Sequence, residues 1–127
     1  MANQRALTAS NIRYLLSMAK LNKGGGVRCI DIASDLGLSN PSVHNMMDTF
    51  VKLGLVSRNE HGAAFFTDEG YNTAEKYSRY YVLVSDILKK SFPDMDNVQT
   101  AACLLLSEIP QGTLEELCGK NKPAGEN

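Results

Sequence analysis

The sequence lacks the features that mark several large classes of protein. No apolar run approaches the roughly 20 residues that a membrane-spanning helix needs. Residues 1–6 lack the apolar core of a secretory signal, so we expect a cytoplasmic protein that makes no membrane contact. Its three cysteines, Cys29, Cys103 and Cys118, are far apart and show no CxxC spacing. Neither a disulfide framework nor a zinc ribbon is therefore expected, and two of the thiols should simply be buried.

Histidine is scarce as well, because the chain contains only His44 and His61. No nucleophile–base pair and no pair of carboxylates stands in a recognisable catalytic arrangement, so an enzyme is not expected. The run Gly24-Gly25-Gly26 has the composition of a phosphate-binding loop. However, no Gly-Lys-Ser/Thr follows it and no predicted strand precedes it, which favours a flexible connector.

What the chain does have is the composition of an ordinary globular protein. It has 127 residues, of which 43% are hydrophobic and 21% are charged, and this suits one compact module with an appendage. The formal charge is −1, but residues 1–90 carry a net charge of +3 and residues 91–127 a net charge of −4. The basic excess therefore lies in the first part of the chain.

Residues 30–41 predict a helix that ends in a tight turn. Apolar residues recur at helical spacing in its first part: Ile30, Ile32, Ala33 and Leu36. Gly37 can then take the left-handed conformation that ends a helix. The next helix can begin at once, because Ser39 or Asn40 can accept a hydrogen bond from a backbone N–H and Pro41 suits a first helical position.

The helix that follows this turn is predicted to have one buried face and one short-chained polar face. The buried face should contain Val43, Met46, Met47, Phe50 and Leu53. The outward face should contain Ser42, His44, Asn45, Asp48 and Thr49. Such a polar N-terminal half is typical of a helix that lies in the major groove of DNA.

A β-hairpin is predicted after Gly54, which ends the second helix. Residues 55–58 and 63–67 are strand-like and flank the turn-forming residues 59–62. Two helices, a tight turn and a hairpin form the layout of a winged helix-turn-helix, which makes DNA the first candidate partner. The alternative is an α+β domain that holds the same elements without contacting DNA.

Helices flank this motif on both sides, so the predicted fold is mainly α with a small β-hairpin. A first helix should cover Thr8–Leu21, and a long linker helix should begin at Thr67 and run to Ser91, with Thr67 as its cap. Two shorter helices are expected at about Met95–Leu106 and Thr113–Gly119. The segment 101–106 is apolar nearly all round, which favours a dimer interface.

These elements predict three parts of the chain. The expected parts are a winged helix-turn-helix DNA-binding domain at 1–70, a long helix with a helical dimerisation domain at 71–119, and a disordered tail at 120–127.

Between about residues 10 and 118 the chain resembles the diphtheria toxin repressor and manganese transport regulator family of metal-dependent bacterial repressors. The matching segments are Asp31–Ser39, Pro41–Val43 with Met46, Gly54–Val56 and Thr67–Gly70. Other regulators, including MarR-like ones, share the winged-helix part. The order of elements favours this family, since one helix precedes the motif, and a long helix and a short helical segment follow it.

The resemblance implies a homodimer with Mn²⁺ or Fe²⁺ at a hinge between two parts of the chain. In this sequence the family's ligand positions fall on Asn11, Tyr14, Tyr80, Gln99 or Thr100, Ala102 or Cys103, and Cys103 or Leu104. Because amides, phenols and one thiol make a poor set of ligands for these ions, we expect that the usual site is lost. A different divalent site on Asp94, Asp96 or Glu108, or an apolar effector in a hinge lined by Tyr14, Tyr80 and Cys103, stays open.

The resemblance also implies roles for residues around the turn. Ser39, Ser42 and His44 match positions that touch phosphates, while Pro41 and Asn45 match positions that approach bases. From their places in the motif, Arg28, Arg58 and His61 are further candidates for phosphate contact. For Ser39 and Pro41 the alternative role is helix capping. For the other residues the alternative is a polar surface that is merely solvated.

Taken together, the sequence predicts a homodimeric winged-helix transcriptional regulator, a repressor by its resemblance. It should bind a double-stranded DNA operator with half-sites about one helical turn apart, in response to an unknown effector. One alternative is the same protein under Mn or Fe control. Another is a winged-helix module for protein–protein interaction, which the acidic C-terminal third and Asp48 would suit.

Overall fold

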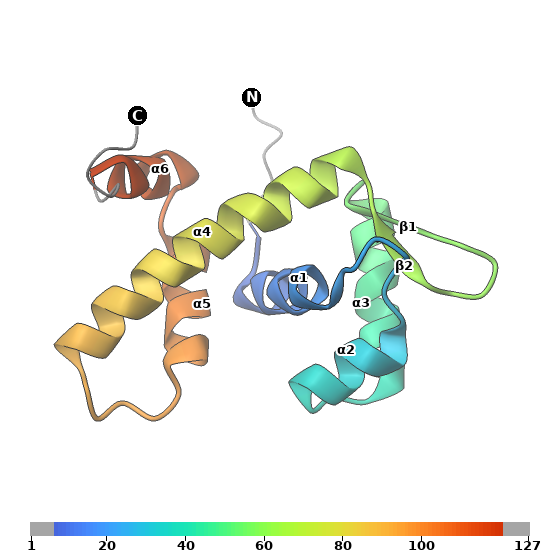
Figure 1. Ribbon diagram of the computed structural model, residues 1–127, viewed down its shortest axis with the longest axis horizontal. Helices are drawn as coiled ribbons and strands as arrows, with labels where there is room; N and C mark the ends of the chain where they lie inside the picture. Colours follow the sequence, from blue (N-terminus) through green and yellow to red (C-terminus); the bar gives the residue numbers. More distant parts are fainter. Residues whose placement is uncertain (1–6, 121–127) are drawn as a thin grey trace. The chain divides into compact units, whose positions relative to one another are not determined.

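A computed structural model describes residues 7–120 of the chain. Contacts divide it into two compact units, one of residues 13–76 and one that joins the N-terminal residues up to Ile12 to the chain from Tyr77 onward. We call them the winged-helix unit and the C-terminal unit. The elements (Figure 1) are α1 Ala9–Leu21, α2 Cys29–Leu36, α3 Asn40–Lys52, β1 Val56–Arg58, β2 Ala64–Phe66, α4 Asp68–Ser91, α5 Val98–Glu108 and α6 Gln111–Lys120.

This arrangement confirms the predicted winged helix-turn-helix fold, with a two-stranded antiparallel hairpin after two short helices. Of the predicted tail 120–127, all but Lys120 lies outside the described residues. No helix within residues 7–120 is long and apolar enough to cross a membrane.

The turn between α2 and α3 follows the local signals of the sequence. Gly37 has φ 69° and ψ 37°, which is the left-handed conformation that lets α2 end. The Ser39 hydroxyl accepts a hydrogen bond from the backbone N–H of Ser42 at 3.2 Å, and Pro41 lies in the first turn of α3. Both the predicted stop and the predicted cap are confirmed.

The core of the winged-helix unit is built from one face of each of its helices. Ile32 of α2 and Val43, Met47 and Phe50 of α3 are fully buried. The prediction for Ile30 is wrong. Its side chain was expected on the apolar face of α2, but it is 54% exposed. Cys29, one residue earlier, is buried instead, and one residue along a helix turns the side chain by about 100°.

Two more residues of the predicted apolar face are only half-buried, namely Met46 and Leu53. They lie at the edges of the α3 face that packs on the core. The buried stripe of α3 is therefore narrower than the sequence predicted.

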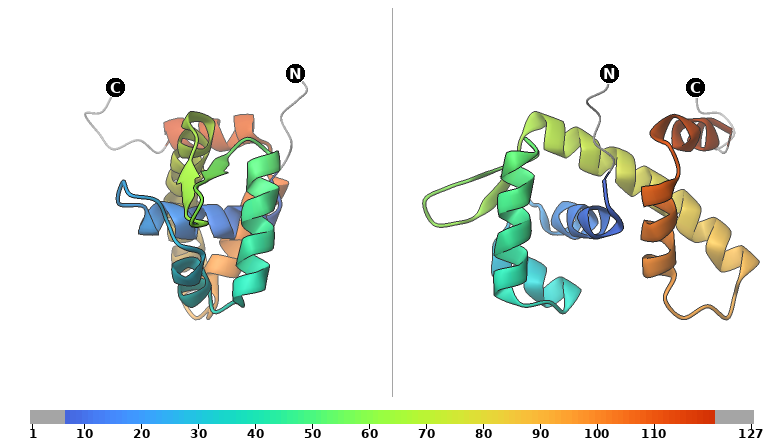
Figure 2. Two further views of the ribbon diagram at one scale, coloured as in Figure 1. Left: turned by 90° about the vertical axis from the view of Figure 1, so that its right-hand side faces the viewer. Right: turned by 180° about the vertical axis from the view of Figure 1, so that it is seen from behind.

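The hairpin pairs Val56 with Phe66 and Arg58 with Ala64. Figure 2 shows it protruding from the winged-helix unit. Val27, which follows the glycine-rich connector, adds an isolated bridge: its N–H donates to the Ala64 carbonyl and its carbonyl accepts from the Ala64 N–H, both at 2.8 Å. The sequence analysis missed this third paired position, which ties the connector to the hairpin.

Helix α4 begins as predicted, since Thr67 caps it. Its hydroxyl oxygen accepts from the Gly70 N–H at 3.0 Å, and the hydroxyl donates to the Gly54 carbonyl at 2.7 Å. The cap therefore also fastens the end of α3 to the start of α4 within the winged-helix unit.

The two last helices differ from their predicted bounds. Helix α5 begins at Val98 rather than Met95, because the Asn97 side chain accepts the Thr100 N–H at 3.1 Å and so caps the helix there. Helix α6 begins at Gln111 rather than Thr113, since the Pro110 carbonyl already accepts the Leu114 N–H at 3.0 Å. Helix α5 also continues to Glu108, two residues past the predicted end.

Candidate nucleic-acid interface

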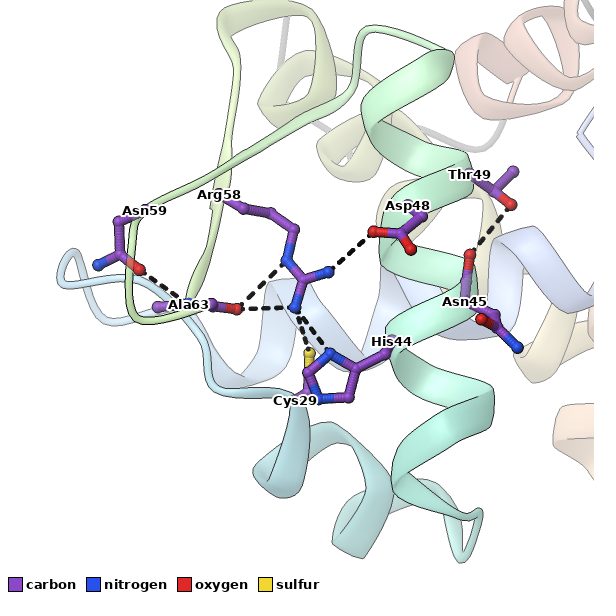
Figure 3. Close-up of polar contacts among 9 residues, drawn as sticks. Cys29, His44, Asn45, Asp48, Thr49, Arg58, Asn59 and Ala63 are labelled. Atoms are coloured by element: carbon purple, nitrogen blue, oxygen red, sulfur yellow. Dashed lines mark hydrogen bonds and ion pairs between the residues drawn. The ribbon is translucent and has the colours of Figure 1, made fainter.

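The outer face of α3 presents the polar side chains that the sequence predicted. Ser42, His44, Asn45, Asp48 and Thr49 are all exposed. The Thr49 hydroxyl donates to the backbone carbonyl of Asn45 at 3.1 Å, one turn earlier. Figure 3 shows the Asn45 amide pointing away from the helix. This face therefore offers short donors and acceptors rather than long charged chains.

The tip of the hairpin is a tight loop held by one asparagine. The Asn59 carboxamide oxygen accepts the N–H of His61 at 3.0 Å and that of Ala63 at 2.9 Å, and Gly62 takes a φ of 84°. The His61 side chain is exposed, with its Nε2 3.9 Å from the Glu60 carboxylate. The Asn59 side chain thus holds the shape of the loop, and the His61 imidazole stays exposed to solvent.

Three of the predicted contact residues line one hollow of about 230 Å³ between the start of α2, α3 and the hairpin. They are Arg28, His44 and His61. The exposed Arg28 guanidinium makes two hydrogen bonds to the Asp31 carboxylate, at 3.0 and 3.2 Å. The structure therefore brings residues from α2, α3 and the wing to one side of the unit.

Ser39 and Pro41 lie at the start of α3, and both are exposed. The Ser39 hydroxyl donates to the Ser42 hydroxyl at 3.0 Å in addition to its capping bond. Capping is thus a definite role of this serine, and phosphate contact remains a prediction for it.

Arg58 differs most from its predicted setting. Its side chain is only 19% exposed, and its guanidinium reaches four groups of the protein itself (Figure 3): the Asp48 carboxylate at 2.9 Å, His44 Nδ1 at 2.8 Å, the Gly62 carbonyl at 3.1 Å and the Cys29 sulfur at 3.5 Å. The sequence analysis found neither the pairing with Asp48 nor the contact with Cys29. No sequence signal points to them, because the partners are 10 and 29 residues away.

The family's metal-ligand positions hold side chains that do not suit Mn²⁺ or Fe²⁺. The Tyr80 hydroxyl donates to the Glu115 carboxylate, and burial, with this acceptor beside it, raises the Tyr80 pKa. Burial also raises the Tyr14 pKa. Both phenols therefore keep their protons at neutral pH and are poor ligands for these ions.

The remaining positions are no better. The Asn11 carboxamide oxygen accepts the backbone N–H of Thr8 at 3.1 Å, Gln99 carries an amide, and Cys103 is buried in α5. Within residues 7–120, no three His, Cys, Asp or Glu side chains lie together in a way that could hold a metal ion. The donor set of this chain does not fit the family's metal.

The buried tyrosines predict that the protein loses stability at high pH. Burial raises the pKa of Tyr14, Tyr77 and Tyr80 above the ordinary value of 10.0. The unfolded chain therefore releases these protons first, so the contribution of these tyrosines to the free energy of unfolding should be constant below about pH 9 and fall as the pH rises through 10. Urea unfolding at pH 8 and 11 measures this, and Tyr14→Phe should make the fall shallower. An unchanged midpoint would contradict the expectation.

A comparison with known protein families finds a helix-turn-helix domain in the sequence. Residues 21–60 match the model of the IclR helix-turn-helix domain. This range runs from the end of α1 into the hairpin. No curated protein sequence matches the chain.

Solved structures show the same fold over nearly the whole chain. A hypothetical protein from Sulfolobus solfataricus superposes with a TM-score of 0.62 at 22% identity, over 93% of this chain and 92% of its own. IdeR from T. acidophilum superposes with a TM-score of 0.62 at 16% identity, over 91% of this chain and 55% of its own. The metal-dependent transcriptional regulator MtsR superposes with a TM-score of 0.64 at 13% identity, over 88% of this chain and 52% of its own. This chain thus spans about half the length of IdeR and MtsR, and the likeness shows a shared fold.

Proposed function

We propose that this protein is a sequence-specific DNA-binding transcriptional regulator that acts as a homodimer, a repressor of the diphtheria toxin repressor type without that family's usual metal site. The observation that carries the proposal is the exposed polar face of α3. It follows a capped tight turn and stands beside a hairpin, in the arrangement that places a helix in the major groove. The match to a helix-turn-helix domain supports it.

Within this proposal the residues divide by what they contact. Asn45, with its exposed amide, reads a base edge, and Pro41 approaches the bases. The exposed side chains around them touch phosphates and set the register of the protein on the duplex: Arg28, Ser39, Ser42 and His61. His44 and Arg58 are treated together below, because the structure joins them.

The homodimer is supported by apolar surface on the C-terminal unit. Val82 of α4 is 69% exposed, and Leu104 and Leu105 of α5 are 53% and 40% exposed. Exposed apolar side chains of this size favour an interface where they form a contiguous patch, and a second copy of the chain would cover such a patch. A second copy of the chain would also supply the second recognition helix that a two-fold operator requires.

DNA binding with and without Mn²⁺ is the primary test. Fluorescence polarisation with random-sequence duplex DNA at low salt should show binding that Mn²⁺ does not change, after which a selected operator can be used. Binding that appears only with Mn²⁺ would favour the alternative of a metal-dependent repressor, for which MtsR gives a structural precedent. No binding in either condition would leave the protein-interaction module, since Asp48 places a carboxylate on the face that would meet phosphates.

Asn45→Ala is expected to relax sequence preference. A bidentate amide–adenine contact contributes about 1–3 kcal/mol of discrimination, so the ratio of operator to random-DNA affinity should fall by about 5- to 150-fold. The affinity for random DNA should stay nearly unchanged. Asn72→Ala provides the control, because Asn72 is an exposed asparagine on α4 of the same unit. Equal losses on operator and random DNA would contradict the role of Asn45.

A further inference from the structure

Arg58 joins three elements of the winged-helix unit at the face proposed to meet DNA. It leaves β1 and reaches Asp48 and His44 of α3 through Nη1 and Nη2, at 2.9 and 2.8 Å. Its Nε and Nη2 donate to the Gly62 carbonyl at the tip of the wing, at 3.3 and 3.1 Å. Nη2 also contacts the sulfur of Cys29 at the start of α2. These contacts hold the guanidinium on two sides.

The contact with His44 determines how that imidazole is protonated. A guanidinium carries only N–H donors and stays charged at any physiological pH. His44 Nδ1, 2.8 Å away, must therefore be the acceptor. A neutral imidazole has one donor and one acceptor nitrogen, so the proton sits on Nε2. An imidazolium would turn an N–H toward the Arg58 N–H and lose the bond.

We propose that Arg58 is a positioning residue that holds the exposed, neutral His44 as a single Nε2–H donor for DNA, rather than being itself a phosphate contact. This inference rests on the proposed DNA binding. The DNA group must be an acceptor, either a purine N7 or guanine O6 in the major groove or a phosphate oxygen. Asp48 has a part in it, because its carboxylate balances the Arg58 charge and fixes the guanidinium against α3.

Salt dependence separates positioning from phosphate contact. Each phosphate contact makes the slope of log K against log salt steeper by about 0.9, so losing one contact makes the slope shallower by that amount. Arg58→Ala should weaken operator binding about tenfold with the slope unchanged. The control Arg28→Ala, at an exposed arginine proposed to touch phosphate, should make the slope shallower by about 0.9. Arg58→Lys keeps the positive charge but not the planar set of N–H donors, so it should lose as much operator affinity as Arg58→Ala. A shallower slope for Arg58→Ala, or full binding by Arg58→Lys, would overturn the proposal.

A double mutant tests whether the two residues act together. His44→Ala should also lose about tenfold in operator affinity. The double variant His44→Ala with Arg58→Ala should lose no more than either variant alone, because Arg58 acts on DNA only through the His44 donor. A combined loss of about one hundredfold would overturn the proposal. If the His44→Ala loss is confined to the selected operator, the acceptor is a base; an equal loss on random duplex identifies it as a phosphate.

Nitrogen-15 NMR of the imidazole gives a readout that needs no DNA. In the wild-type protein at pH 7.5, His44 should show the Nε2–H tautomer, and Arg58→Ala should release it to a mixture of tautomers. A wild-type Nδ1–H tautomer or imidazolium would overturn the proposal even if DNA binds. If the tautomer is as expected but the wild-type protein binds no DNA, the proposed function fails while Arg58 still positions His44.

Discussion

Gly70→Ala is expected to lower the free energy of unfolding by about 3 kcal/mol or more, at the severe end of overpacking substitutions. A Cβ on Gly70 would lie 1.8 Å from the Leu55 carbonyl oxygen and 2.7 Å from its carbon. The backbone there has little freedom to move, because the same carbonyl accepts the Thr67 N–H at 3.0 Å and Leu55 is buried. Urea unfolding followed by circular dichroism measures the loss.

Gly112→Ala is the matched control, since Gly112 also lies in the first turn of a helix and a Cβ on it would meet nothing within 4 Å. There alanine should raise stability slightly, by up to about 1 kcal/mol, through its better helix propensity. If both substitutions shift the unfolding midpoint equally, the close approach of α4 to Leu55 is not the cause.

Leu104→Asp is expected to separate the proposed dimer and to weaken operator binding about 100-fold or more. The two recognition helices of a dimer bind one operator jointly, and the avidity lost on separation is of this order. A carboxylate at an interface would have to lose its hydration without a partner, which is costly. Sedimentation velocity at micromolar protein, with polarisation on the selected operator, measures both effects.

Ile30→Asp controls for the introduced charge. Ile30 lies in the winged-helix unit and is 54% exposed, against 53% for Leu104. It should leave the oligomeric state unchanged. A dimer that survives Leu104→Asp, or one that dissociates equally with Ile30→Asp, would argue against the apolar face of α5 as the interface.

The turn and caps of the helix-turn-helix were predictable because their causes are local. Gly37 ends α2 by its own backbone conformation, and Ser39 and Thr67 cap their helices by bonds to residues three positions on. The start of α5 was predicted at about Met95, whereas the observed start depends on which side chain caps the helix. Asn97 does so, and it sets the boundary three residues later.

The candidate site could be predicted as a set of residues but not as a network. Helical periodicity was enough to predict that His44, Asn45 and Asp48 are exposed on one face of α3. Periodicity does not state which distant side chain crosses to that face. Arg58 was therefore predicted to reach outward, and the structure shows it directed inward at α3 and the wing tip.

The sequence by itself determined the elements of this protein, their order and the polar face of α3, because spacing, glycine and capping act over a few residues. Only the tertiary structure decided which groups on that face are already occupied. Asp48, His44 and Cys29 lie 10, 14 and 29 residues from Arg58 and meet it only when the hairpin folds beside α3. The same holds for Gly70. It has no room for a Cβ because a backbone carbonyl fifteen residues earlier in the chain lies against it.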